Sequence, residues 1–270
     1  MNSLSSADQQ ILLQHLEQIQ KRQAQTNFLS FVKSIDIPGA PVTDLDECEE
    51  FYPDRVEPAL HHRLICAVLQ QVSDGHRKRV MLFMPPGSAK STYTTVCFAP
   101  FEMGRKKRFN IICASYGSTL ARKFGRKSRA IARSPEFAAT FDCGLSAASS
   151  AADEWSLTAP SESEYMAGGI LSGMTGNRAD GLLIDDPMKG RAEADSETIR
   201  DKTWEAYKDD LSTRLKPNAW QVIIQTRWHE DDLSGRLLPE NYDGRSGPVQ
   251  GTDGHDWFVV NLPMIAEHDS

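Results

Sequence analysis

The sequence lacks the features that would place the protein in a membrane or an oxidising compartment. Its longest apolar runs, such as residues 80–84, are far shorter than the roughly 18 to 20 apolar residues that span a bilayer. The first ten residues, MNSLSSADQQ, show no secretory signal, because they contain neither a basic segment nor an apolar core. The five cysteines are scattered, without a C-x-x-C pair. We therefore expect a reducing cytosol, no disulfide framework or zinc site, and cysteines buried as small apolar residues.

The chain also has no overall excess of basic residues. It has 30 Lys and Arg against 37 Asp and Glu, a net charge of −7, which excludes a small basic protein that coats nucleic acid. The segment 101–134 is different, with ten basic residues and one acidic residue, Glu102. Such a basic stripe suits phosphates or an acidic neighbouring surface, and the alternative is a solvated helix face without a partner.

Length and composition are those of a globular protein, with 270 residues, 40% hydrophobic and 25% charged. Apolar segments predict strands at residues 80–84, 109–115, 165–171, 181–184, 220–226 and 257–260. Amphipathic segments predict helices at residues 1–25, 62–72, 90–98, 118–133 and 196–214, and we expect loops at 138–152 and 241–255. In the helix 118–133, Leu120, Phe124 and Ile131 form the predicted apolar stripe. The alternation of strands and helices predicts an α/β fold with a central, mainly parallel sheet flanked by helices.

The first predicted strand leads into a phosphate-binding pattern at residues 80–92, VMLFMPPGSAKST. In such a loop, backbone N–H groups cradle phosphates, a lysine reaches the β- and γ-phosphate oxygens, and a hydroxyl holds Mg²⁺. Lys90 and Ser91 match the end of the pattern G-x-x-x-x-G-K-[ST], whereas Met84 and Ala89 occupy its glycine positions. Ala89 is tolerated if its backbone is near helical. The alternative is a Pro-Gly turn capped onto a helix.

Two adjacent acids, Asp185 and Asp186, end the predicted strand LLIDD. Ligands of α/β proteins gather at the carboxyl edge of the sheet. A phosphate site needs an acid there for Mg²⁺ and a base that orients the attacking water. We therefore assign Asp185 to the metal, through its water shell, and Asp186 to the water. The alternative is an Asp-Asp-Pro turn that opens a helix.

A third strand end lies in residues 222–233, VIIQTRWHEDDL, where Thr226 and Arg227 follow a buried strand. A polar residue on a strand beside a phosphate loop can sense the γ-phosphate and couple its loss to movement. His229 and the acids at 230–232 could suggest a metal cluster, but H-E-x-x-H spacing is absent. We predict instead that they cap and charge the start of the next helix.

Together, the segments MPPGSAKST, ICASYGSTLARKFGRKSRAI, SGMTGNRADGLLIDDP and QTRWHEDDL resemble the large terminase subunit of tailed bacteriophages, the ATPase that pumps genomic DNA into a procapsid. The motifs follow the family's order and approximate spacing over residues 53–265. The resemblance implies an additional-strand P-loop NTPase fold at 51–270, preceded by a helical and loop extension at 1–50.

The resemblance also implies cofactors, ATP and Mg²⁺, and a role for each matching residue. The ATP-binding residues of the Walker A segment would be Pro86, Gly87, Ser88, Ala89, Lys90, Ser91 and Thr92. Ser91 and Asp185 would hold the metal, while Lys90, Asp186 and Thr226 would act in hydrolysis and coupling, Thr226 together with Arg227. Tyr52 and His62 lie where the family's base-binding segment would fall, and packing is the alternative role for both.

Two departures from the family pattern lead to further expectations. Some members carry a Walker A arginine where Pro85 and Pro86 stand here, so an arginine finger must come from elsewhere, for example from a neighbouring subunit. Arg178, just before the Walker B strand, is the candidate, and an ordinary loop arginine is the alternative. The chain ends near where the linker to a ribonuclease-H-like nuclease domain would begin. We therefore expect the motor half alone, without nuclease activity.

The implied partners are double-stranded DNA, a portal protein, a small terminase subunit and further copies of the chain in a ring on the procapsid. No membrane partner is expected, and the implied location is the cytoplasm of an infected bacterium. The basic stripe could contact the DNA backbone or the acidic surface of the next subunit. An alternative function is a nucleotide-binding assembly module with little hydrolysis. A third is a metal-dependent hydrolase that uses Asp185, Asp186 and His229.

Overall fold

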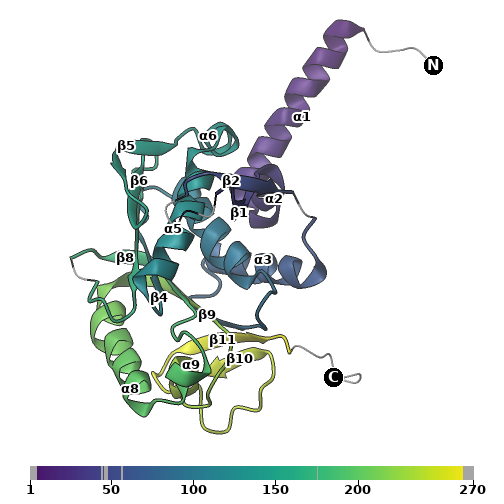
Figure 1. Cartoon of the computed structure of the whole chain (residues 1–270). Helices are drawn as coiled ribbons and strands as arrows, with labels where there is room; N and C mark the ends of the chain where they lie inside the picture. Colours follow the sequence, from purple (N-terminus) through teal and green to yellow (C-terminus); the bar gives the residue numbers. More distant parts are fainter. Residues whose placement is uncertain (1–4, 44, 46–47, 56, 175, 264–270) are drawn as a thin grey trace.

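The computed structural model describes residues 5–43, 45, 48–55, 57–174 and 176–263, and it contains two sheets (Figure 1). The last residues of the predicted ATPase domain and of the resemblance, 264–270, lie outside this part. β1 (Ile37–Pro41) and β2 (Phe51–Asp54) form a two-stranded antiparallel sheet. No described helix is long and apolar enough to cross a bilayer.

The main sheet has nine strands, and its centre is parallel. In spatial order the strands are β10 (Gly247–Gln250), β11 (Asp256–Asn261), β3 (Arg79–Phe83), β9 (Leu215–Gln225), β8 (Ala179–Asp185), β4 (Ile111–Ser115), β7 (Glu164–Gly169), β6 (Glu154–Leu157) and β5 (Leu145–Ser150). The strands from β11 to β7 run parallel, while β10, β6 and β5 pair antiparallel with their neighbours. The predicted α/β fold and all six predicted strands are therefore confirmed.

The position of β9 defines the type of sheet. β9 lies between β3, which leads into the phosphate loop, and β8, which ends in Asp185. Phe83 pairs with Gln225 and Asp185 pairs with Ile224, so the three strands end at one edge in register. This is the additional-strand arrangement, and it brings the three predicted strand ends to a common edge.

Helices cover both faces of the sheet. They are α1 (Ser6–Thr26), α2 (Phe28–Ser34), α3 (Leu60–Ser73), α4 (Phe98–Arg105), α5 (Ser118–Arg133), α6 (Pro135–Phe141), α7 (Arg191–Ala194), α8 (Glu197–Glu205) and α9 (Leu233–Leu237). Two π-helical segments, η1 (Thr92–Cys97) and η2 (Ala206–Leu211), and a short 3₁₀ helix, η3 (Ser212–Arg214), continue some of them. The helix predicted to start at Lys90 thus runs through η1 and α4 as far as Arg105.

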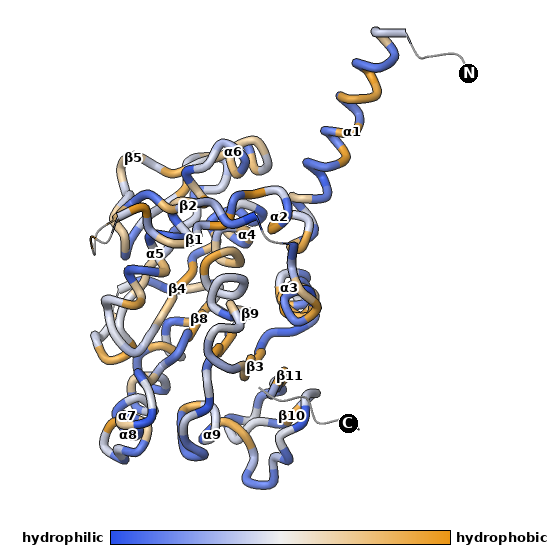
Figure 2. Tube along the Cα trace, turned by 45° about the vertical axis from the view of Figure 1, so that its right-hand side comes forward, coloured by the Kyte–Doolittle hydropathy of each residue, from blue (hydrophilic) through white to orange (hydrophobic). Residues whose placement is uncertain are grey.

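Two hydrophobic clusters occupy the two faces, and alternate residues of each central strand belong to different clusters. Val80 and Leu82 face α2 to α6, whereas Met81 and Phe83 face η2 and α9. Phe31 of α2 joins the first cluster, while α1 projects from the body of the molecule (Figure 1). Figure 2 shows apolar residues concentrated on β3. Burial on both faces explains why these strands read as continuous apolar runs.

Two predicted loops contain regular structure. Residues 138–152 include the end of α6 and all of β5, and residues 241–255 include β10. α6 starts at a proline, and the Ser134 hydroxyl before it accepts the N–H of Phe137. The small-residue composition of this segment concealed the buried side chains of Phe137 and Phe141, which pack on each other with ring centroids 5.0 Å apart.

α5 has the predicted bounds but presents a different face to the sheet. Its buried residues include Ala121, Gly125 and Ile131, whereas the predicted Leu120 and Phe124 are only partly buried. A Cβ on Gly125 would lie 2.0 Å from the carbonyl oxygen of Ala152, so only glycine permits this close approach. Small residues, rather than large apolar ones, therefore mark the packed face.

Burial of the cysteines is confirmed for four of the five, and Cys48 is the exception, because it is only partly buried. Burial raises the pKa of Cys66 and of Cys113 to about 12, so neither thiol ionises at neutral pH.

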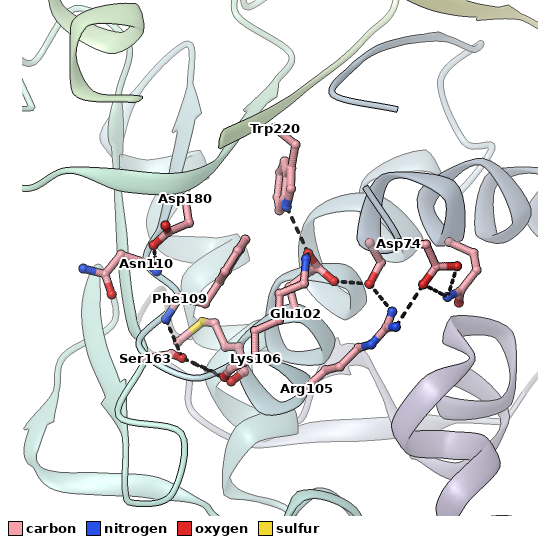
Figure 3. A network of polar contacts seen from close by, with 12 residues as sticks. Asp74, Glu102, Arg105, Lys106, Phe109, Asn110, Ser163, Asp180 and Trp220 are labelled. Atoms are coloured by element: carbon pink, nitrogen blue, oxygen red, sulfur yellow. Dashed lines mark hydrogen bonds and ion pairs between the residues drawn. The ribbon is translucent and has the colours of Figure 1, made fainter. Parts of the chain in front are cut away.

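A buried carboxylate fixes the far end of the helix that starts at Lys90 (Figure 3). Glu102 of α4 is fully buried and accepts hydrogen bonds from Trp220 Nε1 of β9 at 2.9 Å and from Lys106 Nζ at 2.6 Å. Glu102 also accepts the Ser73 hydroxyl of α3. These contacts join the helix to β9 and α3 at the amino edge of the sheet, so the site at the carboxyl edge stands on a fixed frame.

Candidate nucleotide-binding site

The three strand ends predicted to carry chemistry meet in one polar network. Lys90 is 7% exposed, and its Nζ donates to Thr226 Oγ1 at 3.2 Å and lies 3.5 Å from Asp186 Oδ2. The Thr226 hydroxyl in turn donates to the carbonyl oxygen of Met84 at 3.2 Å, and the Thr226 N–H donates to Asp186 Oδ1 at 3.0 Å. Residues from β3, β8 and β9 therefore surround the lysine amine.

Beside this network lies the pair assigned to the metal. The Ser91 hydroxyl donates to Asp185 Oδ1 at 2.9 Å, and the Thr95 hydroxyl donates to the other carboxylate oxygen. Asp185 is fully buried. Burial, together with the charge of Asp186, raises the pKa of Asp185 to about 7. Thr95 was missed in the sequence, although it lies four residues after Ser91 and thus on the same helix face.

The oxygen atoms here fit a magnesium ion. Hydroxyl and carboxylate oxygens are the ligands that Mg²⁺ takes from proteins, and it is commonly bound by one or two carboxylates plus substrate phosphates. The hydrogen bonds to Asp185 come from neutral hydroxyls, so its buried charge would be compensated by a cation at this point. Ser91 and Asp185 are the residues that would hold it.

The loop between β3 and Lys90 has a conformation suited to wrap an anion. Gly87 has φ +79°, and a Cβ built there would have nothing within 4 Å, so space lies in front of the loop. The N–H groups of Gly87 and Ala89 donate to no acceptor in the described part of the chain. Free amides at the start of a helix form an anion-binding concavity.

Ala89 corrects one expectation. Its φ is +55°, in the left-handed region, rather than near the right-handed helical value that would make alanine acceptable. This is the second glycine position of the motif, and here an alanine accepts the strain that glycine avoids.

Replacing Ala89 with glycine is therefore expected to raise the free energy of unfolding by about 1 kcal/mol, because it relieves the positive φ. Urea unfolding measures the change. Ala130→Gly, in the interior of α5, is the matched control and is expected to lower the free energy of unfolding by about 1 kcal/mol. A loss of stability in both variants would contradict the strain at position 89.

Asp186 also has a positive φ, +47°. Its N–H donates to the carbonyl oxygen of Ile224, and its own carbonyl oxygen accepts the N–H of Tyr116. These bonds hold Asp186 in the turn that follows β8 and aim its carboxylate at Thr226 and Lys90. Strained backbone held by its surroundings is typical of functional sites.

His62 braces the phosphate loop from α3, whereas Tyr52 does not reach it. His62 Nδ1 accepts the Ala59 N–H at 3.2 Å, so Nε2 carries the proton and donates to the carbonyl oxygen of Ser88 at 3.1 Å. The His62 ring stacks on Tyr93, with centroids 4.3 Å apart. Tyr52 is 58% exposed and makes no described contact with the loop.

Both hydrogen bonds of His62 require the neutral ring, which gives a pH dependence. Burial and the nearby His61 lower the pKa of His62, so the folded state binds its proton less readily than the unfolded state. The stability that His62 contributes is present above about pH 6.5 and decreases as the pH falls below that value. We expect His62→Gln to reduce the loss of stability between pH 6.5 and 5 in urea unfolding, and the exposed His76→Gln to leave it unchanged. Equal pH profiles for wild type and His62→Gln would contradict this prediction.

Arg178 does not lie with the predicted site residues. It precedes β8, so it is at the amino edge of the sheet, whereas Asp185 is at the carboxyl edge. It lines a separate cavity with Trp204 and Lys208. Arg178 therefore cannot reach the phosphate loop of its own chain, and a role as an arginine finger could only be exerted on a neighbouring subunit.

The acidic turn after Thr226 has the predicted capping role. Asp232 caps α9, with its carboxylate accepting the N–H of Gly235 at 2.9 Å, and it pairs with Arg227 at 2.7 Å. His229 Nδ1 accepts the N–H of Asp231. No group of three or more His, Cys, Asp or Glu among the described residues could hold a metal ion, so the hydrolase built on His229 is not supported.

Most of the basic stripe is paired within the chain. Arg129 and Arg133 contact Glu49, Arg122 pairs with Asp153, and Lys106 pairs with Glu102. Arg105 and Arg108 pair with Asp74 and Glu162. Lys107, Lys123 and Arg126 have no ion pair with the described residues. The stripe therefore serves largely to hold the chain's own loops and helices together.

These features define a P-loop NTPase fold with an additional strand between the Walker A and Walker B strands. Residues 81–267 match the family model of the terminase large subunit, T4likevirus-type, N-terminal, and the chain belongs to this family. The structure is similar to the crystal structure of the HK97 bacteriophage large terminase, with a TM-score of 0.53 and 12% sequence identity. That similarity covers 82% of this chain and 45% of the HK97 chain, so this chain spans less than half the length of that protein. No curated protein sequence matches it.

Proposed function

We propose that the protein is an Mg²⁺-dependent ATPase that powers the translocation of double-stranded phage DNA into a procapsid. The observation that carries the proposal is the convergence of Lys90, Asp186 and Thr226 within hydrogen-bond or ion-pair distance, beside the Ser91–Asp185 pair. Membership of the terminase large subunit family supports DNA packaging as the process served.

Each residue has a distinct task in this proposal. The amides of residues 86–92 and the Lys90 amine bind the β- and γ-phosphates, and Ser91 and Asp185 hold Mg²⁺. The metal ion, when bound, neutralises charge that develops on the phosphate oxygens. Asp186, at the edge of the site, orients the attacking water and accepts its proton. In the absence of nucleotide, Lys90 is held by Asp186 and Thr226, and binding of phosphate would draw the amine away from them.

Thr226 is suited to relay the state of the nucleotide. Its hydroxyl contacts Lys90, its N–H contacts Asp186, and it ends β9, whose Trp220 is tied to Glu102 on the phosphate-loop helix. A change at the γ-phosphate would therefore alter two contacts of Thr226 and load β9, which is a route from hydrolysis to movement.

The partners of the proposed motor are a portal protein, a small terminase subunit and further copies of this chain in a ring. The proposed site of action is the cytoplasm of the infected host, transiently at the procapsid. The arginine finger that the ring would supply is not identified by the geometry of one chain.

A steady-state phosphate-release assay with and without double-stranded DNA tests the proposed function. We expect Mg²⁺-dependent release that chelation with EDTA abolishes. The second candidate is an assembly module that binds nucleotide with little turnover, and the strained Ala89 in the loop favours it. Nucleotide binding without release above background, with or without DNA, would support the assembly module and contradict the motor.

A further inference from the structure

A second cavity opens at the amino edge of the sheet. Its volume is about 840 Å³, within the range of about 300 to 1,000 Å³ typical of ligand sites. It is lined by Arg79 and Gln221, which pair in register at the starts of β3 and β9. The phosphate loop begins five residues further along β3, which at 3.3 Å per residue is about 17 Å away. The two sites are therefore separate.

Cationic side chains dominate the lining of this cavity. Five basic residues face one carboxylate, Asp253, on a chain whose net charge is −7. The basic residues are Lys78, Arg79, Arg178, Lys208 and Lys216. Asp253 is itself engaged, because it accepts hydrogen bonds from Trp257 Nε1 and the His255 N–H. Such a concentration of charge attracts anions.

Several of these cations have no anion to pair with. Among the described residues, Arg79 and Arg178 form no ion pair, and the Arg79 Nε is shielded from solvent without any hydrogen-bond partner. Lys78 donates to the neutral amide of Asn218 at 2.8 Å. Lys216 is paired with Asp180 at 2.7 Å. A shielded N–H without an acceptor costs free energy, and a bound anion would remove that cost.

An aromatic wall completes the cavity. Trp204 is partly buried and lines it, with its ring centroid 5.9 Å from that of Tyr207. Tyr207 is fixed, because its hydroxyl donates to Gln221 Oε1 at 2.9 Å. Nucleic-acid bases stack on such rings while basic side chains contact the phosphates. An acidic peptide would use the cations but has no need of the indole.

We propose that this cavity binds a nucleotide unit, with its phosphate at Arg79 and Arg178 and its base against Trp204. The unit could be a free nucleotide or one residue of a single DNA strand, since both present the same phosphate and base. This site goes beyond the proposed hydrolysis, because none of its residues contacts the phosphate loop. It also gives Arg178 a role within its own chain.

Fluorescence anisotropy of the full chain with a labelled ten-thymidine oligonucleotide tests the proposal, with unlabelled thymidine monophosphate as competitor. EDTA replaces Mg²⁺ and no ATP is present, so the result does not depend on hydrolysis. The variant is Arg178→Ala/Lys208→Ala, in which both residues are exposed. The matched control is Lys123→Ala/Arg126→Ala on α5, which removes the same charge from the surface that would otherwise contact DNA.

We expect the cavity variant to weaken oligonucleotide binding at least tenfold, and to lower the slope of log affinity against log salt by about 1.4, or 0.7 for each lost phosphate contact. The control should remain within about twofold of wild type. Trp204→Ala should weaken binding about tenfold, and Trp204→Phe should retain most of it. Thermal unfolding midpoints close to wild type show that the variants are folded.

Displacement of the oligonucleotide by thymidine monophosphate would identify a free nucleotide as the ligand, and binding without such displacement would identify a strand. Both results support the site when the cavity variant loses affinity. Absence of binding to either probe, unchanged affinity in the cavity variant, or an equal loss in the α5 control would overturn it. The phosphate-release assay without oligonucleotide reports on the hydrolytic site alone, so the two proposals can fail separately.

Discussion

Replacing Lys90 with alanine is expected to reduce ATP turnover by roughly 10²- to 10³-fold, the usual effect of removing one preorganised charge or donor from a transition state. The lysine amine is nearly buried between Thr226 and Asp186, so no solvent-exposed side chain can take its place. A coupled phosphate-release assay under saturating Mg²⁺-ATP measures the effect.

The fold should survive this substitution. Asp186 keeps the Thr226 N–H as a hydrogen-bond donor, and its side chain is 27% exposed, so water can solvate the charge that Lys90 leaves. The exposed Lys202→Ala on α8 is the matched control and should turn over ATP as wild type does. Near-normal turnover in Lys90→Ala, with an unchanged thermal unfolding curve, would remove the phosphate loop from the mechanism.

The second large effect is expected from Asp186→Asn. Asparagine has the same shape, and its side-chain oxygen can still accept the Thr226 N–H, so the turn after β8 is retained. It lacks the charge and the basicity that orient and deprotonate water. We expect affinity for a non-hydrolysable ATP analogue to stay within a few-fold of wild type, while turnover falls by about 10²- to 10⁴-fold.

Calorimetric titration of the analogue and single-turnover hydrolysis separate the two effects. Asp195→Asn, at an exposed position after α7, is the control for loss of one negative charge. If Asp186→Asn lost binding and turnover equally, Asp186 would act in holding the nucleotide or the loop rather than in activating water.

Much of the architecture follows from patterns that are local in the sequence. Each buried strand is a short apolar run followed by a polar residue, and parallel strands place those polar residues at one edge. For this reason Lys90, Asp185 and Thr226 could be brought together on paper before any coordinates. The same rule predicts the position of Arg178, which precedes its strand and must lie at the opposite edge; that signal was present but was not used.

Other features depend on contacts that the sequence does not display. The basic residues of α5 pair with Glu49 and Asp153, and no local pattern connects these partners. The left-handed conformation of Ala89 is imposed by the loop, since alanine alone favours the opposite region. β5 is a strand of small residues that forms only because β6 offers an edge to pair with. Tertiary context decided these positions over intrinsic preference.

The most direct test is a crystal structure of the chain with Mg²⁺ and a non-hydrolysable ATP analogue. The account predicts the β- and γ-phosphates against residues 86–92 and the Lys90 amine, with the metal ion bound to Ser91 Oγ and next to Asp185. A triphosphate bound elsewhere on the molecule, or a metal ion that contacts neither Ser91 nor the water shell of Asp185, would contradict it.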